Sequence, residues 1–165
     1  MWLSRFFRKN TEAQLPPHRR WPIRSHDHDA DPDHYRLRIF GAVKAPFELG
    51  IDELRAMPST EVLADLGGKG RTARHWVGLD ARRLLCSCGP CVEAEWLVIH
   101  SDGGYLYRLP VDVLYEGPSI LAYGVDGGPL SRSDGGPIRL VMPHLEPWRC
   151  AKWVRGLELE VGVAS

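Results

Sequence analysis

The chain has 165 residues, the size of one domain, because domains usually contain about 100–200 residues. Lys and Arg number 21 and so do Asp and Glu, so the formal net charge is zero. This balance argues against a nucleic-acid-binding protein that relies on a broad basic surface, and against an acidic tail. Hydrophobic residues make up 44% of the chain, so it can build a core without disulfide or metal staples.

The sequence predicts a cytoplasmic protein without a membrane span. No apolar run reaches the roughly 18–20 residues that cross a bilayer. The segment 1–10 lacks the apolar core and cleavage site of a signal peptide. Three of the four cysteines, Cys86, Cys88 and Cys91, lie within six residues, which is not the spacing of a secreted disulfide framework. We therefore expect reduced thiols.

Residues 1–34 are predicted to form an irregular arm, and residues 35–165 are predicted to form the folded domain. The arm has no periodic apolar face. Its segment 25–34 contains three His and four Asp, which are metal-ligand types. Pro32 interrupts that segment and no ligand spacing is fixed, so a solvated loop is the favoured interpretation.

The first predicted strand covers residues 35–41, where apolar and polar residues alternate. A short helix follows over residues 51–57 and ends before Pro58. A second strand is expected over residues 61–64. It leads into the glycine-rich, basic loop 65–71.

A second short helix is predicted over residues 81–86, with Asp80 as its N-cap. A turn at 102–104 and a helical turn at 111–115 connect later strands. Those strands are expected over residues 95–100, 105–109, 119–123, 138–142 and 153–161. The chain shows no long amphipathic helix and no βαβ alternation, so the predicted class is α+β, with a mixed, largely β-sheet core and short helices.

The loop 65–71 suits a phosphate group, because its glycines allow close backbone approach and Lys69 and Arg71 supply positive charge. It is not a P-loop, since the G-x4-G-K-[ST] spacing is absent. Phosphate binding and a solvated turn both remain open.

The motif Cys88-Gly-Pro-Cys91 matches the dithiol of thioredoxin-like proteins. There the motif opens a helix, whereas here it follows the predicted helix 81–86, so Gly89 is better explained as a helix stop. Cys86, Cys88 and Cys91 also provide three of the four ligands of a zinc site, which would need a fourth from Cys150 or a His. Unligated surface thiols are the third interpretation.

The segment 143–153 is dense in polar and aromatic residues and lies between two predicted strands. It contains His144, Arg149 and Lys152, which suit an anionic ligand. The alternative is a packed connection that two tryptophans anchor.

Residues 135–153 resemble the GGP-x-R-L-V-x-P-H-L-Y-x-W-K-S-x-K-W block of molybdopterin-dependent oxidoreductases of the sulfite oxidase superfamily, most of all its small bacterial cytoplasmic branch. The resemblance extends over about residues 16–161. Its other segments occur in the family's order and are 19–23, 35–43, 52–54, 76–79, 109–110, 121–123 and 128–130.

This resemblance implies a mixed α+β fold around a molybdopterin that carries molybdenum. It also implies oxygen-atom transfer on a small oxoanion or sulfoxide, with a redox partner protein. His144, Arg149, Cys150 and Lys152 match positions of the family's cofactor-binding loop, with Arg149 where Lys is usual and Cys150 where Ser is usual. Lys69 and Arg71 of the glycine-rich loop are further candidates for cofactor binding.

The largest difference from the family concerns the metal. Relatives carry a cysteine that ligates molybdenum in an H-C-V-x-x-W-S-like segment, but residues 64–75 contain no Cys. An ungapped alignment places Asp65 at the position of the ligating cysteine, as the candidate catalytic and metal-ligating residue. A gapped alignment places residues 66–69 opposite that cysteine instead. A carboxylate is a harder donor than a thiolate. Three hypotheses follow: an oxidoreductase with altered turnover, an inactive binding or scaffold module, or a separate metal or redox site at Cys86, Cys88 and Cys91.

Overall fold

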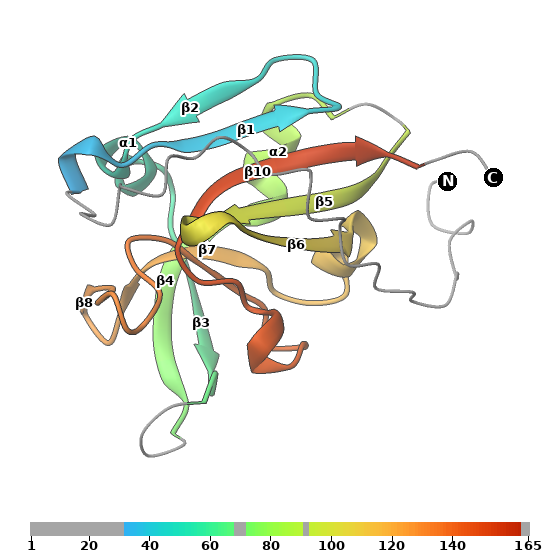
Figure 1. Ribbon diagram of the computed structural model, residues 1–165. Coiled ribbons are helices and arrows are strands. Elements are labelled where there is room, and N and C mark those ends of the chain that lie inside the picture. The colour runs from blue at the N-terminus through green and yellow to red at the C-terminus, as the bar shows by residue number, and fades with distance from the viewer. Residues whose placement is uncertain (1–31, 68–71, 91–92, 163–165) are drawn as a thin grey trace.

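The computed structural model describes residues 32–67, 72–90 and 93–162, and within them the strands form two five-stranded sheets (Figure 1). The strands are β1 (Leu37–Gly41), β2 (Phe47–Leu49), β3 (Thr60–Ala64), β4 (Arg74–Asp80), β5 (Ala94–Ser101), β6 (Tyr105–Pro110), β7 (Ile120–Val125), β8 (Gly128–Pro129), β9 (Arg139–Val141) and β10 (Val154–Val161). The helices are α1 (Ile51–Ala56) and α2 (Ala81–Ser87), with the 3₁₀ turns η1 (Pro32–His34), η2 (Asp102–Gly104), η3 (Val111–Tyr115) and η4 (Pro147–Arg149).

The first sheet has the order β2-β1-β10-β5-β6, so the last strand lies at its centre. β10 runs parallel to β1 and antiparallel to β5. The second sheet has the order β3-β4-β7-β8, with β9 paired to β7, and its pairs are antiparallel. Short helices beside mixed and antiparallel sheets confirm the predicted α+β class.

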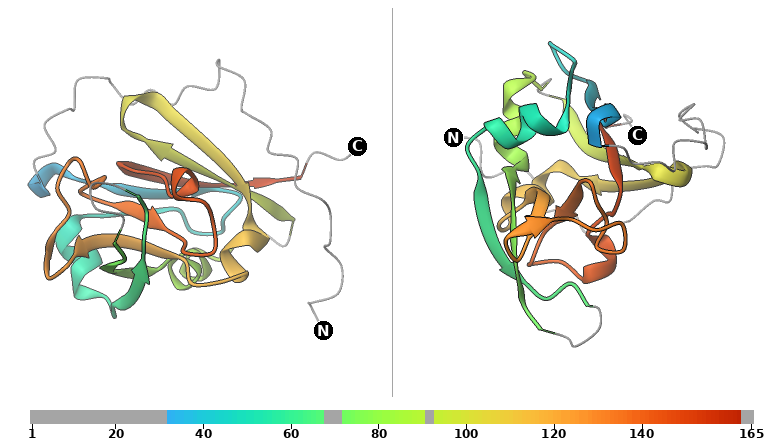
Figure 2. Two further views of the ribbon diagram at one scale, coloured as in Figure 1. Left: turned by 90° about the horizontal axis from the view of Figure 1, so that it is seen from below. Right: turned by 90° about the vertical axis from the view of Figure 1, so that its left-hand side faces the viewer.

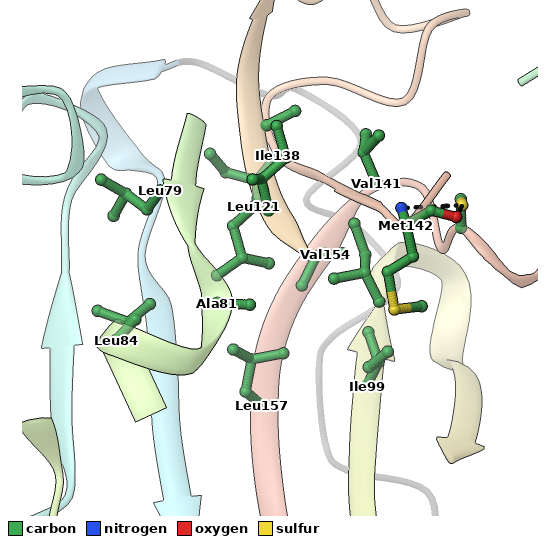
Figure 3. Packing of buried hydrophobic residues seen from close by; sticks show 14 of the residues in the cluster. Leu79, Ala81, Leu84, Ile99, Leu121, Ile138, Val141, Met142, Val154 and Leu157 are labelled. Atoms are coloured by element: carbon green, nitrogen blue, oxygen red, sulfur yellow. Dashed lines mark hydrogen bonds between the residues drawn. The ribbon is translucent and has the colours of Figure 1, made fainter. Parts of the chain in front are cut away.

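The core lies between the two sheets. Side chains from β4 and β7, such as Leu79 and Leu121, gather with Ile99 and Leu157 of the first sheet (Figure 3). In β10 the buried Leu157 and Leu159 alternate with more exposed glutamates, which is the pattern of a strand with one face on the core. Each large apolar side chain that is fully buried contributes about 1.5–3 kcal/mol.

Both predicted helices are confirmed. The Glu53 carboxylate accepts a hydrogen bond from the Gly50 backbone N–H over 2.6 Å at the start of α1. Asp80 caps α2 by accepting from the backbone N–H groups of Arg82 (2.9 Å) and Arg83 (3.4 Å). α2 ends at Ser87 and is followed by Gly89 with a φ of +61°, a left-handed conformation that glycine adopts readily.

The sequence did not predict the strands β2, β4 and β8. In β4 the alternation is broken because the pairing with β7 shifts register between Val77 and Gly78. A Cβ at Gly78 would lie 2.1 Å from the Leu121 carbonyl oxygen, so only glycine permits this close approach.

The β3–β4 hairpin runs away from α1 and α2 (Figure 2). Asp65 follows β3 at one end of the hairpin, and α2 follows β4 at the other end. Across residues 32–67, 72–90 and 93–162, no helix is long and apolar enough to cross a membrane.

Candidate functional site

The connection 143–153 folds back onto the loop between β8 and β9. The Trp153 N–H donates to the Gly135 carbonyl oxygen over 2.9 Å, and the Leu140 N–H donates to the Ala151 carbonyl oxygen over 2.9 Å. These bonds place Lys152 beside Arg139, the first residue of β9.

Arg139 carries a buried guanidinium, since only 5% of the residue is exposed. Its Nη1 donates to the Asp134 carbonyl oxygen over 3.0 Å, and its Nε is buried without a hydrogen-bond partner in the part of the chain that the structure describes. Burial lowers the pKa of Arg139 from its ordinary value, because desolvation disfavours the charged form. An anion at the guanidinium would relieve this cost.

Lys152 is the second cation at this place. Its ammonium donates to the Ser133 carbonyl oxygen over 2.8 Å. Burial lowers the pKa of Lys152, and the positive charge of Arg139 lowers it further. Gly135 allows the two to approach: its φ is +102°, and a Cβ there would lie 2.6 Å from Lys152 Cγ and 3.2 Å from Arg139 Cδ.

Arg74 of β4 extends this cluster. It pairs with Asp126 over 2.6 Å and with Asp134 over 2.7 Å. Burial works to raise the pKa of Asp134, but hydrogen bonds from Ser131 and Arg74 outweigh it and hold the pKa below its usual range.

We call Arg74, Asp126, Asp134, Arg139 and Lys152 the cation cluster. Three cations against two carboxylates leave one positive charge in excess. Because Arg139 is buried and Lys152 is partly buried beside it, the cluster suits a phosphate or another anion.

Cys150 lies against the same cluster. The residue is 2% exposed, and its Sγ accepts from the Met142 backbone N–H over 3.4 Å. Burial raises the pKa of the Cys150 thiol, which keeps it protonated at neutral pH. Its contact with Met142 holds the connection 143–153 against β9.

The other two candidates of this connection make different contacts. His144 Nε2 lies 2.9 Å from the Val113 carbonyl oxygen, so it carries the proton and donates to η3. The Arg149 guanidinium lies 5.1 Å from the centre of the Trp148 ring, and its Nε is 3.7 Å from a Glu146 carboxylate oxygen. The hydrogen bond of His144 therefore goes to η3, whereas Lys152 joins Arg139.

The end of β3 lies next to the cation cluster, because Ala64 pairs with Arg74 across the hairpin. Asp65 is exposed, and its carboxylate accepts from the Gly67 backbone N–H over 2.9 Å. Leu66 is 8% exposed and continues the inward face of β3. After β3, Leu66 therefore faces the core, and the Asp65 carboxylate is bound by the backbone of the same turn.

The remaining candidates lie elsewhere. Cys86 is exposed on α2, and Cys88 is buried and donates from Sγ to the Leu85 carbonyl oxygen over 2.8 Å. Since α2 is at the far end of β4, both lie away from Asp65. No group of three or more His, Cys, Asp or Glu side chains suited to a metal occurs among the described residues. Lys69, Arg71 and Cys91 are outside the described residues.

Sequence reasoning missed Arg139 as a site residue, although the residue lies in the block that carries the resemblance. A signal was present: a charge in the run from Ile138 to Val141, all of which is buried in the structure. A buried arginine within an apolar strand is rare unless it is paired, so it marks a candidate for ligand binding.

Residues 24–162 match the family model described as "Oxidoreductase molybdopterin binding domain". An uncharacterized oxidoreductase, YuiH, from Bacillus subtilis is 33% identical over 127 residues, which are 75% of this chain and 64% of YuiH. Rat mitochondrial sulfite oxidase is 27% identical over 185 residues, covering 91% of this chain and 34% of that protein. The chain thus spans less than two thirds of either relative.

The fold is similar to that of a solved structure, the sulfane dehydrogenase SoxCD from Paracoccus pantotrophus. The TM-score is 0.69 at 26% sequence identity, and the match covers 78% of this chain and 39% of the SoxCD chain.

Proposed function

The chain belongs to the molybdopterin-binding oxidoreductase domains of the sulfite oxidase superfamily, and from this premise we propose that it binds a molybdenum-carrying molybdopterin and supports oxygen-atom transfer on a small oxoanion or sulfoxide. The observation that carries the proposal is the buried guanidinium of Arg139 beside the partly buried side chain of Lys152. The terminal phosphate of the cofactor is a dianion, and these two cations can donate charge-assisted hydrogen bonds to it.

The described residues fit the phosphate end of this cofactor. The buried Nε of Arg139 is a hydrogen-bond donor without an acceptor among the described residues, and a phosphate oxygen would accept its hydrogen bond. Lys152 supplies a second charge, and Gly135 leaves the space in which both side chains meet. We propose Arg149, His144 and Cys150 as supports of this loop, and Lys69 and Arg71 as further donors to the phosphate.

The metal end differs from the family pattern. Residues 64–75 hold no thiol, and the Asp65 carboxylate is engaged by the Gly67 N–H. When bound, the cofactor supplies the two-electron chemistry, and the role of this chain is to hold and orient it. We propose Asp65 as the carboxylate that ligates the metal. Its hydrogen bond from the Gly67 N–H would have to break first.

A second candidate function is a binding module that holds the cofactor without turnover. The missing thiol and the inward position of Leu66 favour it. A family likeness identifies the fold more securely than it identifies a surviving activity. A separate metal or redox site at Cys86, Cys88 and Cys91 is the remaining alternative, and zinc analysis would detect it.

A redox partner and a cytoplasmic location belong to the same proposal. A two-electron step on the substrate requires a partner that delivers or removes the electrons. Cys86, Cys88 and Cys150 carry no disulfide within the described part of the chain, which is usual in a reducing compartment.

The test is turnover by the chain purified from cells that make molybdopterin. Sulfite oxidation is followed with ferricyanide as electron acceptor, and sulfoxide reduction with reduced viologen as donor. Turnover in proportion to molybdenum content, lost in Asp65→Ala, supports the enzyme. A fully loaded chain that turns over neither substrate supports the binding module instead.

A further inference from the structure

Asp102, in the turn η2 between β5 and β6, joins two arginines that lie far apart in the sequence. Its carboxylate accepts from Arg155 Nε over 2.7 Å and from Arg132 Nη1 over 3.0 Å. The residue is only 5% exposed. A buried carboxylate with two guanidinium partners is fully paired, so it can hold both arginines in place.

The backbone of Asp102 makes a third connection. Its N–H donates to the Trp153 carbonyl oxygen over 2.9 Å. Trp153 has a φ of +55°, which is rare for a bulky residue and must be held by its surroundings. Its N–H donates to Gly135, and its indole N–H donates to the Arg132 carbonyl oxygen over 2.8 Å. Trp153 directly follows Lys152.

These contacts meet at the cation cluster. Arg132 belongs to the loop whose Ser133 and Asp134 carbonyl groups receive Lys152 and Arg139. Arg155 lies three residues after Lys152, at the start of β10. The carboxylate of Asp102 therefore ties together the two segments that set the positions of both cations.

Tyr35, two residues before β1, supports the arrangement. Its ring centre lies 4.8 Å from the Arg155 guanidinium carbon, and its hydroxyl donates to the Val154 carbonyl oxygen over 2.6 Å. Tyr35 therefore contacts the Arg155 guanidinium and the backbone of the neighbouring Val154.

We propose that Asp102 is a positioning residue for the anion-binding site, acting through Arg132 and Trp153 on the placement of Lys152 and Arg139. The inference rests on the proposed function, since it assumes that the cation cluster binds an anion. Charge alone predicts the opposite effect, because removing a carboxylate near a cationic site should strengthen anion binding. Weaker binding without Asp102 is thus specific to positioning.

The experiment measures binding of inorganic phosphate to the full cofactor-free chain by titration calorimetry. Asp102→Asn keeps the shape and removes the charge. Arg132→Gln removes the more exposed partner of Asp102, whose side chain is 42% exposed. The Arg155 partner is unchanged, so Asp102 keeps one guanidinium. The control is Arg108→Gln, because Arg108 pairs with Glu160 on the same sheet, outside this network. Thermal midpoints report whether each variant is folded.

We expect phosphate affinity to fall by roughly fivefold or more in both Asp102→Asn and Arg132→Gln, and to stay unchanged in the control. The loss in Arg132→Gln should persist at 0.5 M salt, where long-range charge effects between exposed groups are largely screened. Affinity equal to or above that of the wild type in folded Asp102→Asn overturns the proposal.

If Asp102→Asn does not fold, Arg132→Gln at high salt decides, and unchanged affinity there overturns the proposal. The proposed function fails separately, when the wild-type chain itself binds neither phosphate nor molybdopterin. In that case no variant differs from the wild type, so the two failures are distinct.

Discussion

The guanidinium of Arg139 lies over the indole of Trp76, with 5.2 Å between the guanidinium carbon and the ring centre. Trp76 is 2% exposed, and its indole N–H donates to the Ala64 carbonyl oxygen over 3.1 Å. A desolvated cation over a tryptophan face gains about 2 kcal/mol, which offsets part of the cost of burial. The same indole thus fixes the end of β3 and stabilises the cation of β9.

Arg139→Met should separate ligand binding from stability. Because the guanidinium is buried and partly unpaired, a methionine of similar shape should leave the free energy of unfolding of the cofactor-free chain unchanged or raise it by about 1 kcal/mol. Cofactor retention should be lost. Urea denaturation and pterin content measure the two effects. A destabilisation above about 2 kcal/mol would show that the guanidinium is mainly structural.

Anion affinity should fall with rising pH at Lys152. Burial and Arg139 place the pKa of Lys152 below that of an ordinary lysine, about 10.4. The Lys152 ammonium is charged below this lowered pKa and loses its charge as the pH rises through it. Sulfate binding should therefore weaken as the pH rises through the pKa of Lys152. In Lys152→Arg the fall should vanish, because arginine stays charged. A fall of equal size in that variant would exclude Lys152 as its cause.

The lowered pKa of Lys152 should make the folded chain more stable as the pH rises, whereas anion binding weakens. Because the folded pKa of Lys152 lies below its unfolded value, the charged form costs stability, and the cost disappears as the pH rises through the folded pKa toward the unfolded one. An anion at the site should remove this pH dependence by restoring the pKa. Urea denaturation with and without sulfate measures the difference.

The Asp80 cap should be worth about 1 kcal/mol. Asp80→Ala removes the acceptor for two backbone N–H groups of α2 and the ion pair with Arg82, so the free energy of unfolding should fall by about 0.5–2 kcal/mol. Asp80→Asn keeps an acceptor and should lose less. Equal losses in the two variants would assign the effect to charge instead of capping.

Cys86 should react with an alkylating reagent in the folded chain, whereas Cys88 and Cys150 should not. Cys86 is exposed, whereas Cys88 and Cys150 are buried and their thiols have raised pKa values. Iodoacetamide should therefore label Cys86 in the native chain and label the other two only after unfolding. Peptide mass spectrometry identifies the sites. Native labelling of Cys150 would contradict its packing against Met142.

Local signals predicted much of the fold. Alternation located β1, and the caps and stops at Asp80 and Pro58 located both helices, because these features depend on near neighbours in the chain. Strands were also predicted at the places of β5, β6 and β10. The bulged strand β4 was missed, since its course depends on how Gly78 approaches β7.

The site was predictable only in part. Lys152 was a candidate both from the charges of the segment 143–153 and from the resemblance, but Arg139 and Asp102 depend on contacts over long sequence distances. Asp102 meets Arg132 and Arg155 across 30 and 53 residues. Asp65 was selected by counting along the sequence, whereas the alternation of β3 turns Leu66 inward instead. Which side chain faces inward is a property of sheet packing, which alignment by position does not reveal.

The most direct test of the central claim is the pterin and molybdenum content of the chain purified from a molybdopterin-producing host. Pterin is measured by fluorescence after oxidation, and molybdenum by elemental analysis. The Arg139→Met/Lys152→Met double variant is the comparison, and Arg108→Gln is the matched control.

We predict nearly one pterin per chain in the wild type and the control, and little in the double variant. A wild-type chain without pterin, from cells whose other molybdenum enzymes are loaded, would contradict the account.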